Sequence, residues 1–372
     1  MSVAVVGAGI SGMSIACHAL ERGLGPVTVY DGAGIGTGAS AVQPGGVRQQ
    51  WGSAANCAMA RESRAFYLEL SDRLGVDVDA TFDPCGYLFL ADHDGSLAQL
   101  VANVRLQREA GVPSRLVTPA EASAHVPGLE PEGVAGGAYC AEDGYFDRPQ
   151  AVVAAFAAAA RARGAVLERS HVRSIARDGA GWRVETDDGR SALVEQVAVA
   201  AAAETAALLA PLGARLPIEP EPRFLFLGEP RSVRLLDPLV IAVDRGLAAK
   251  QLADGRLLAS DLRAAGDPDT ESERWRGNVR GSLERLLPAL AGEPLPTLVR
   301  GTYDMTPDAQ PIVDELAPGL WVAAGFSGHG FMVAPSTGRL VAAGLAGDPL
   351  PGWHEAVRAG RFGDAARDTQ VI

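Results

Sequence analysis

Cysteine is scarce in this 372-residue sequence, and its four copies lie far apart. They are Cys17, Cys57, Cys85 and Cys140, and no two of them form a Cys-x-x-Cys pair. Thiolate metal sites and redox disulfide motifs both rely on closely spaced cysteines, so the sequence supports neither class. Reduced thiols in a cytoplasmic protein are the plain expectation.

Long apolar runs and an excess of positive charge are also missing. The alanine-rich stretch from Ala151 to Ala160 stops at Arg161, well short of the length that spans a bilayer. The net charge of -12 argues against a nucleic-acid or anionic-membrane surface. The first strand-like run begins at Val3, which leaves no room for a signal peptide, so we expect a cytoplasmic protein.

Lysine is almost absent. Among the 33 lysines and arginines, Lys250 is the only lysine. Such a bias is typical of genome composition rather than of function, but it draws attention to the one position where a lysine stands.

The first 31 residues have the order of a dinucleotide-binding unit, which is strand, glycine turn, helix, strand and acid. In such a unit the first glycine permits the tight turn, the second admits a pyrophosphate, and the third lets helix and strand pack closely. The helix N-terminus offers backbone donors and a partial positive charge to the phosphates. The acid is placed to bind an adenosine ribose. These elements are, in order, Val3–Val6, Gly7-Ala8-Gly9-Ile10-Ser11-Gly12, Met13–Arg22, Val27–Tyr30 and Asp31.

A second glycine-rich stretch follows at once, from Gly32 to Ser40 and from Gln43 to Arg48. Glycine this dense cannot be core packing. It suits backbone that lies against a flat, phosphorylated ligand, and a mobile loop is the alternative.

The rest of the chain mixes nucleotide-type elements with antiparallel strands. Helices are expected at 56–74, 96–110, 149–163, 270–287 and 336–345. Thr118 should cap a short helix, with Pro119 at its first position and Glu121 at its third. A proline-rich crossing at Leu216–Pro222 separates two regions of different character. Strands are expected at 86–90, 166–169, 172–175, 182–186, 193–199, 223–228, 239–243, 248–252, 256–260 and 320–325.

Two late motifs, taken with the early ones, resemble the D-amino acid oxidase and sarcosine oxidase family of flavoenzymes. The early part is Gly7-x-Gly9-x-x-Gly12 with Asp31, followed by the run from Gly38 to Gln50. The late part is Tyr303-Asp304-Met305-Thr306-Pro307-Asp308 and the run from Ala323 to Phe331. The resemblance covers the whole chain and is closest to sarcosine oxidase and the beta subunits of its multi-subunit relatives.

The resemblance implies an α/β fold of the D-amino acid oxidase and p-hydroxybenzoate hydroxylase type. A Rossmann-like FAD-binding domain (1–80, 145–215 and 301–372) is then interleaved with an α+β substrate domain built on an antiparallel sheet (81–144 and 216–300). By resemblance, N–H groups of the late turn stabilise charge on the reduced ring. The implied FAD contacts are Gly7, Gly9, Ile10, Ser11, Gly12, Asp31, Gly32, Ser40, Ala41, Gly45, Gly46, Val47, Val172, Ala200, Gly325, Gly328, His329, Gly330, Phe331 and Met332.

The sequence also departs from the family pattern. The cysteine that tethers FAD in monomeric sarcosine oxidases is replaced by Gly301, so we expect non-covalent FAD. No histidine occurs between Gly137 and Ala155, where beta subunits carry one for covalent FMN. Trp51 and Met332 stand where sarcosine oxidases use an arginine and a lysine, so carboxylate binding must come from elsewhere and the substrate can be bulkier or more apolar than sarcosine.

Candidate site residues follow from side-chain chemistry. Arg48 can clamp a carboxylate with its planar guanidinium, and Arg223 is a second candidate. Tyr303 and Tyr87 are hydroxyl candidates, although a tyrosine on a strand more often packs. Lys250 falls in the stretch where related oxidases place the lysine that assists oxygen reduction, with a solvated strand lysine as the alternative. His329, Phe331 and Met332 are expected to shape the pocket, and Trp51 to contact substrate.

The resulting interpretation is an FAD-dependent oxidase of a secondary amino acid or N-substituted glycine. A hydride would pass from the carbon next to the amine to flavin N5, the imine would hydrolyse, and dioxygen would become hydrogen peroxide. Two alternatives stay open, namely a dehydrogenase that passes electrons to a quinone or partner protein, and a non-catalytic flavin-binding subunit. The expected partners are the amine and dioxygen, without nucleic acid, membrane or metal, and the oligomeric state is left open.

Overall fold

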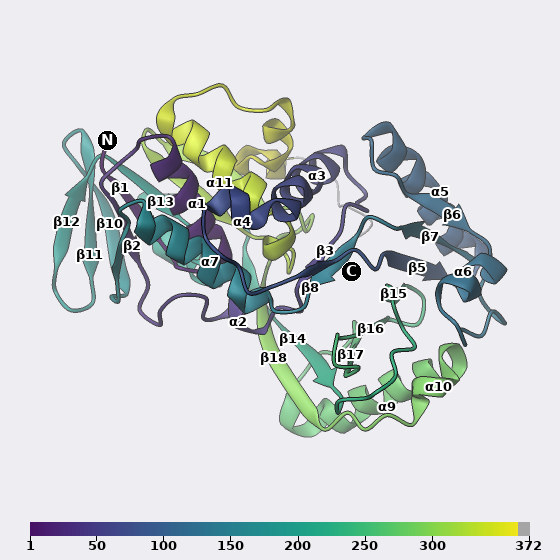
Figure 1. The fold of residues 1–372 in the computed structure, drawn as a ribbon. Coiled ribbons are helices and arrows are strands. Elements are labelled where there is room, and N and C mark those ends of the chain that lie inside the picture. Colours follow the sequence, from purple (N-terminus) through teal and green to yellow (C-terminus); the bar gives the residue numbers. More distant parts are fainter. Residues whose placement is uncertain (364–372) are drawn as a thin grey trace.

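A computed structural model describes residues 1–363 of the chain. Figure 1 shows two lobes, one built around a mostly parallel sheet with helices and one around a larger mixed sheet. This is the α/β architecture that the sequence predicts.

The first sheet has six strands in the order β19-β20-β13-β1-β2-β9, drawn from the start, the middle and the end of the chain. All neighbours are parallel except β19, which runs antiparallel to β20. The strands are β1 (Val3–Val6), β2 (Val27–Tyr30), β9 (Val166–Glu168), β13 (Gln196–Val199), β19 (Ile312–Ala317) and β20 (Leu320–Ala324).

Both faces of this sheet are covered, which explains the unbroken apolar run of β1. Successive side chains of a strand point to opposite faces. Val3 and Val5 therefore pack with the helices, while Ala4 and Val6 pack toward a three-stranded antiparallel meander. The helices are α1 (Ile10–Glu21), α3 (Ala54–Leu68), α7 (Pro149–Ala162) and α11 (Gly330–Ala346), and the meander is β10 (Val172–Asp178), β11 (Gly181–Thr186) and β12 (Ser191–Val194).

The second sheet has eight strands in the order β18-β14-β17-β16-β15-β5-β7-β6. Helix α9 (Pro268–Leu286) covers one face through the buried Trp275, and helix α5 (Asp94–Glu109) covers the opposite face at the β5–β7 end. The strands are β5 (Tyr87–Ala91), β6 (Arg115–Val117), β7 (Gly136–Cys140), β14 (Glu219–Leu227), β15 (Leu239–Ala242), β16 (Leu247–Gln251), β17 (Leu257–Asp261) and β18 (Thr297–Met305).

A further small sheet, of three strands, joins the two lobes. Strands β3 (Gly46–Val47) and β4 (Phe82–Asp83) both pair antiparallel with β8 (Gly144–Phe146). The remaining helical segments of the described chain are α2 (Ala39–Val42), α4 (Leu70–Leu74), α6 (Pro119–His125), α8 (Thr205–Leu209), α10 (Pro288–Ala291) and the 3-10 turns Ala202–Glu204, Ala210–Leu212, Gly352–Val357 and Ala359–Gly363.

Most predicted elements are confirmed within a few residues, and one cap is confirmed in detail. The Thr118 hydroxyl accepts from the Glu121 N–H at 3.2 Å, and the Glu121 carboxylate accepts from the Thr118 N–H at 2.8 Å. This reciprocal pair starts α6 at Pro119, as the sequence predicts.

The prediction of one strand over 193–199 is wrong. The stretch is two strands, because β12 ends at Val194 in the meander and β13 begins at Gln196 in the parallel sheet. The single predicted helix over 56–74 is likewise two, with α3 ending at Leu68 and α4 beginning at Leu70.

The predicted start of the last helix at Ser336 is also wrong, because α11 begins at Gly330 and contains Pro335. Proline has no N–H, so the carbonyl four residues earlier, that of Phe331, loses its helical donor. The hydroxyl of Tyr67 donates to that carbonyl at 2.6 Å instead. A side chain from α3 thus replaces the missing bond, which no reading of the local sequence could reveal.

The proline-rich crossing is partly strand. Pro220 and Pro222 lie in the part of β14 that pairs with β18 alone. Strand β17 pairs with β14 only from Phe226 onward. Prolines are tolerated there because this end of β14 has a neighbour on one side alone. The division into two interleaved domains stays a prediction, and β18 runs across its proposed boundary at residue 301.

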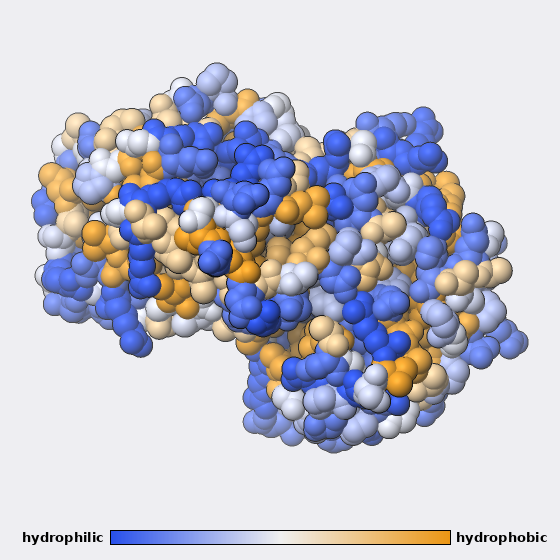
Figure 2. Space-filling model, in the orientation of Figure 1, coloured by the Kyte–Doolittle hydropathy of each residue, from blue (hydrophilic) through white to orange (hydrophobic). Residues whose placement is uncertain are grey.

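The surface drawn in Figure 2 has hydrophilic residues spread over both lobes, with apolar residues scattered among them. Among the helices of residues 1–363, none combines the length and apolar character needed to cross a membrane. Within the same residues, His, Cys, Asp and Glu side chains form no cluster suited to a metal ion.

Candidate active site

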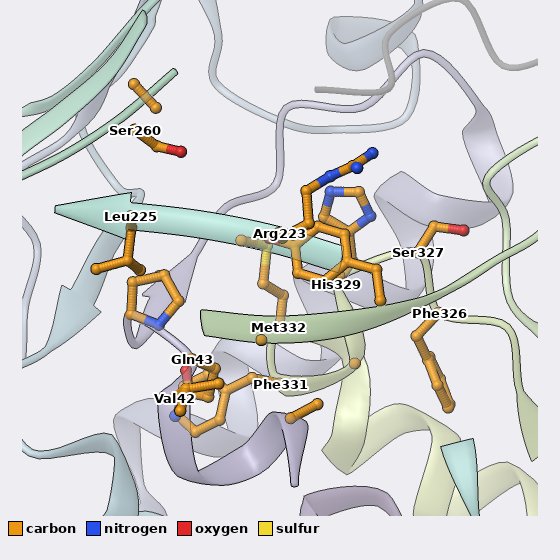
Figure 3. Close-up of a pocket in the computed structure, with 18 of the residues that line it drawn as sticks. Val42, Gln43, Arg223, Leu225, Ser260, Phe326, Ser327, His329, Phe331 and Met332 are labelled. Carbon is orange, nitrogen blue, oxygen red and sulfur yellow. The ribbon is translucent and has the colours of Figure 1, made fainter. Parts of the chain in front are cut away.

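A cavity of about 500 Å³ lies between the two glycine turns and the eight-stranded sheet. Its walls come from the N-terminus of α1, from α2 and the loop to β3, from β14 to β18, and from the start of α11. Figure 3 shows residues from these segments directed toward a common space. The predicted site residues in its lining are Gly9, Ile10, Ser11, Ser40, Gly46, Arg48, Tyr87, Ala200, Arg223, Lys250, Tyr303, Gly328, His329, Gly330, Phe331 and Met332.

The early glycine turn is packed so tightly that side chains are excluded. A Cβ on Gly7, whose φ is 103°, would lie 2.3 Å from the carbonyl oxygen of Ala200. A Cβ on Gly12 would lie 1.9 Å from the carbonyl oxygen of Gly7. These contacts hold the turn against β13 and bring α1 close to β1, which is the geometry expected for a bound pyrophosphate.

The N-terminus of α1 is suited to an anion. Its N-cap is Gly9, no acidic residue stands in its first turn, and the Ser40 hydroxyl accepts from the Ile10 N–H at 3.1 Å. A helix N-terminus with unfilled donors and a partial positive charge stabilises phosphate. The residues present therefore fit the pyrophosphate of a dinucleotide such as FAD.

Asp31 ties the loop after β2 to the same turn. Its carboxylate accepts from the N–H groups of Ala8 at 2.8 Å, Ala33 at 2.9 Å and Gly34 at 2.8 Å. It stands at the end of β2, where a ribose contact is predicted, and that contact stays a prediction. Two further predicted residues lie nearby, since Gly32 packs against His171 and Val172 opens β10.

Several other predicted residues lie outside the cavity lining. The Gly325 N–H donates to the Asp304 carboxylate at 2.7 Å, which fixes the end of β20. Burial raises the pKa of Asp304. The full set outside the lining is Gly7, Gly12, Asp31, Gly32, Ala41, Gly45, Val47, Trp51, Val172 and Gly325.

Arg48 is buried, with only 1% of its surface exposed, and several contacts hold its guanidinium in place. Its Nη1 donates to the carbonyl of Gln50 at 2.5 Å, and its Nη2 lies 3.4 Å from Nε2 of His329. The guanidinium also lies 4.1 Å from the centre of the Trp51 ring. These contacts fix the direction in which the guanidinium meets the cavity.

Trp51 is not among the residues that line the cavity. The indole N–H donates to the carbonyl of Arg48 at 3.2 Å, and its ring meets the His329 ring edge-on at 4.5 Å. Trp51 therefore supports Arg48 and His329 from behind. Its contact with substrate stays a prediction.

The sequence reasoning missed Asp143, a fully buried carboxylate behind the Arg48 loop. It accepts from the Gln49 N–H at 2.9 Å and from Nε2 of Gln50 at 3.2 Å. Burial raises the pKa of Asp143 to about 6, although the bonds from Gln49 and Gln50 oppose the shift. Its partners are 93 and 94 positions away, so only the folded chain reveals the group.

Arg223 and Tyr303 face the cavity together from the paired strands β14 and β18. The guanidinium lies 5.4 Å from the centre of the Tyr303 ring. Its Nη1 bonds to the Glu221 carboxylate and to the carbonyl of Pro222, while Nε and Nη2 make no hydrogen bond with any of residues 1–363. The Tyr303 ring packs on Gly328, where a Cβ would lie 2.1 Å from the ring.

Lys250 lies on the cavity face of β16 and is fully buried. Its Nζ donates to the carbonyl of Pro44 at 2.6 Å and lies 3.7 Å from the centre of the Tyr145 ring. Burial lowers the pKa of Lys250 to about 7. The alternative of a solvated strand lysine is therefore excluded, and the ammonium points at the loop between α2 and β3.

Tyr87 approaches the same loop from β5. A Cβ on Gly46 would lie 2.0 Å from the Tyr87 hydroxyl oxygen and 3.4 Å from the end of the Met332 side chain. Burial raises the pKa of both Tyr87 and Tyr303, so their hydroxyls stay protonated at neutral pH. Neither can act as a base there.

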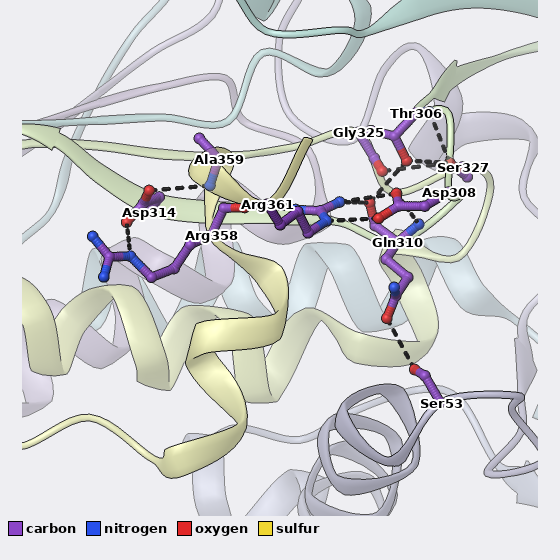
Figure 4. Close-up of polar contacts among 10 residues, drawn as sticks. All are labelled: Ser53, Thr306, Asp308, Gln310, Asp314, Gly325, Ser327, Arg358, Ala359 and Arg361. Carbon is purple, nitrogen blue, oxygen red and sulfur yellow. Dashed lines mark hydrogen bonds and ion pairs between the residues drawn. The ribbon is translucent and has the colours of Figure 1, made fainter. Parts of the chain in front are cut away.

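The C-terminal segment braces the late motif from outside. Arg361 donates to both carboxylate oxygens of Asp308, at 2.7 and 3.0 Å, and to the carbonyl of Gln310 at 2.7 Å. Thr306 in the same loop donates its N–H to the Ser327 hydroxyl at 3.2 Å. Figure 4 shows this chain of contacts leading from Arg361 to the turn before α11.

Comparison with known proteins gives the same picture. The family model described as FAD dependent oxidoreductase matches residues 2–343. Glycine oxidase of Geobacillus kaustophilus (strain HTA426) is 29% identical over 356 residues, which cover 91% of each chain. FAD-dependent oxidoreductase domain-containing protein 1 of Xenopus laevis is 28% identical over 392 residues, 91% of this chain and 78% of its own.

Among solved structures, L-proline dehydrogenase from P. horikoshii superimposes with a TM-score of 0.87 and 29% identity over 97% of each chain. A tight glycine turn at a helix N-terminus, opposite a sheet-lined cavity, fits a flavin-dependent enzyme, and the family match and the glycine oxidase relative place the chain among the FAD-dependent oxidoreductases that act on amines. The chain belongs to the D-amino acid oxidase family of FAD-dependent oxidoreductases, and its cofactor is FAD.

Proposed function

We propose that this protein is an FAD-dependent oxidase of a secondary amino acid or N-substituted glycine. One observation carries the proposal, namely that Arg48, Arg223 and Lys250 line the same cavity as the two glycine turns. Bound FAD would take a hydride from the carbon beside the amine and pass the electrons to dioxygen, giving hydrogen peroxide. The imine product then hydrolyses to an amine and an oxo acid.

The two arginines give the cavity its preference for an anion. Arg48 is oriented by Gln50 and His329, and Arg223 lines the cavity from β14. A planar guanidinium binds a carboxylate through two parallel hydrogen bonds. Together they would hold the substrate carboxylate, in place of the residues that Trp51 and Met332 replace.

The two neutral tyrosines would position the substrate through hydrogen bonds and would not ionise. Tyr303 and Tyr87 keep their protons at neutral pH, so each hydroxyl can donate to substrate or accept from it. Hydride transfer asks the protein mainly to orient one C–H bond and to exclude water.

Lys250 is assigned to the oxygen half of the reaction. Its ammonium is buried, lies at the cavity wall and is fixed on the Pro44 carbonyl. A preorganised cation in a site shielded from water stabilises negative charge as it develops on dioxygen.

A dehydrogenase is the second candidate, since one of the similar solved structures is named as an L-proline dehydrogenase. The experiment is anaerobic mixing of the FAD-loaded chain with sarcosine, glycine, proline, D-amino acids and longer N-carboxymethyl amines, followed by admission of air. Loss of visible flavin colour, then fast recovery with one peroxide per turnover, supports the oxidase. Bleaching with slow recovery favours the dehydrogenase, and no bleaching by any amine favours a non-catalytic flavin subunit.

A further inference from the structure

One face of the eight-stranded sheet lines the cavity with apolar side chains, and at its β15 end this face passes into the cluster that packs on α5. Along β14, Phe224 and Phe226 are buried under α9, while Leu225 between them lines the cavity and is only partly buried. Strand β17 repeats the pattern, with Leu257 and Ala259 in the core and Leu258 in the cavity wall. Alternation along each strand thus sends one apolar set to the core and a second to the cavity.

The strand register aligns this second set across the sheet. Val299 pairs with Leu225, Ser260 pairs with Ala248, and Ala248 pairs with Ile241. Ser260 adjoins Leu225, because β14 and β17 pair at Phe226–Ala259 and the Ser260 hydroxyl donates to the carbonyl of Phe224 at 2.6 Å. We call the row Val299, Leu225, Ser260, Ala248 and Ile241 the apolar row.

The middle of the apolar row is made of small side chains, and we call this part the depression. Ser260 and Ala248 are its two smallest side chains, and they stand between Leu225 and Ile241. The hydroxyl of Ser260 is turned into the sheet by its bond to Phe224, so the depression presents carbon rather than a polar group. Leu258, on the cavity face next to Ser260, adds a further apolar wall.

The apolar row lies within reach of the groups assigned to the reacting end of the substrate. Leu225 is two residues from Arg223 on β14, and Ala248 is two residues from Lys250 on β16, which is about 7 Å along a strand. In Figure 3, Leu225 and Ser260 lie at one end of the cavity and Ser327 and Phe326 at the other. An apolar wall that faces a ligand cavity is stabilised when an apolar group covers it.

We propose that the apolar row is a subsite for a branched alkyl or aryl group carried by the substrate, received by the depression at Ala248 and Ser260. The proposal rests on the proposed function, because it assigns the substituent of that same amino-acid substrate. The substrate class is then an amino acid with a bulky apolar group, rather than glycine or sarcosine.

Binding of carboxylic acids that cannot be oxidised tests the subsite without any turnover. The FAD-loaded chain is titrated with acetate, butanoate, hexanoate and 3-phenylpropanoate, and the change in the visible flavin spectrum gives each dissociation constant. We expect about fourfold tighter binding for each added methylene until the row is covered, from about 0.8 kcal/mol per buried methylene.

Two variants and one control test whether the tighter binding of longer acids comes from the apolar row. Ala248→Phe fills the depression, so hexanoate should lose its advantage over acetate while acetate keeps its affinity within about twofold. Ser260→Leu should have the same effect. It replaces Ala248→Phe in the test if that variant has a lower Tm than the wild type. Ala253→Phe adds the same bulk on the exposed turn between β16 and β17 and should keep the full gain.

The outcomes distinguish failure of the subsite from failure of the proposed function. A dissociation constant that does not change with chain length, or an Ala248→Phe variant that weakens acetate as much as hexanoate, overturns the subsite. Bleaching of the flavin by N-methylglycine but not by N-butyl- or N-benzylglycine or by leucine also overturns it, while the proposed function stands. Tighter binding of long acids without bleaching by any amine keeps the subsite and overturns the proposed function.

Discussion

The ammonium of Lys250 donates to the carbonyl of Pro44 at 2.6 Å, although 206 positions separate the two residues. The bond joins the middle of the eight-stranded sheet to the glycine-rich loop before β3. It fixes the one lysine of the chain at the cavity wall, in a place without solvent. Burial lowers the pKa of Lys250 to about 7, so the charge on this group changes in the physiological range.

Replacing this cation should slow the reaction of the reduced enzyme with dioxygen. For Lys250→Met we expect reoxidation to slow by about 100-fold or more, on the scale of losing one preorganised charge, with reduction by substrate changed less than about threefold. Stopped-flow absorbance measures the two half-reactions separately. Equal slowing of both would remove Lys250 from the oxygen step.

The same group predicts a pH dependence. Lys250 is charged below its folded pKa of about 7 and neutral above it. Reoxidation in the wild type should therefore be fastest below pH 7 and should fall as the pH rises through this value. Lys250→Met should lack this step, and a wild-type rate that instead rises through pH 7 would contradict a role for the cation.

Removing the carboxylate clamp should weaken productive binding. For Arg48→Ala we expect kcat/KM to fall by about 10- to 100-fold, since a charge-assisted hydrogen bond contributes about 1.5–3 kcal/mol. Arg48→Lys should recover little, because an ammonium cannot reproduce the planar fork. Arg105→Ala, at an arginine whose side chain is 83% exposed, is the matched control and should behave as wild type. Unchanged kinetics in Arg48→Ala would leave Arg223 as the only clamp.

The buried carboxylate of Asp143 should leave a mark on stability. Its pKa is about 6 in the folded chain and about 3.9 in an unfolded one, so the folded state binds the proton more tightly between these values. The free energy of unfolding should therefore fall by about 2 kcal/mol as pH rises from 4 to 7 through this group.

Denaturant unfolding at pH 4 to 7 checks this for wild type, for Asp143→Asn and for Asp187→Asn at an exposed carboxyl. Asp143→Asn should lose the fall, whereas Asp187→Asn should keep it. The same pH dependence in all three proteins would show that Asp143 does not titrate in this window.

Breaking the ion pair of Arg361 and Asp308 should loosen the late motif. Their side chains are only 12% and 5% exposed, and removing one partner leaves an uncompensated buried charge. We expect Arg361→Ala to lower the free energy of unfolding by about 3–5 kcal/mol and Arg105→Ala, in an exposed pair, by less than about 1 kcal/mol. Chemical denaturation measures both, and similar small losses would mean that the C-terminal segment does not brace the loop.

The nucleotide half of the fold could be predicted because its signals are local. The spacing of Gly7, Gly9 and Gly12 predicts a tight turn. In the structure, Gly7 and Gly12 lie so close to neighbouring backbone that neither position has room for a side chain. The cap at Thr118 and the alternation of strands β14 to β17 are equally local. Such features depend on backbone geometry within a few residues, so the printed sequence contains them in full.

The remainder depends on contacts between distant segments. Pro335 marks a helix start by local rules, but the Tyr67 hydroxyl lets α11 pass through it. Nothing in the sequence around Trp51 shows that its indole N–H donates to the carbonyl of Arg48. Asp143 belongs to no sequence motif. Its carboxylate accepts hydrogen bonds from Gln49 and Gln50, which lie in the distant loop after β3. The apolar row likewise needs the register of five strands.

The most direct measurement is anaerobic titration of the FAD-loaded chain with N-substituted glycines and with cyclic and bulky amino acids. The account predicts stoichiometric loss of visible flavin colour with at least one carboxylate-bearing amine, and recovery with release of hydrogen peroxide when air is admitted. A chain that binds no FAD, or that keeps its flavin oxidised with every amine, would contradict it.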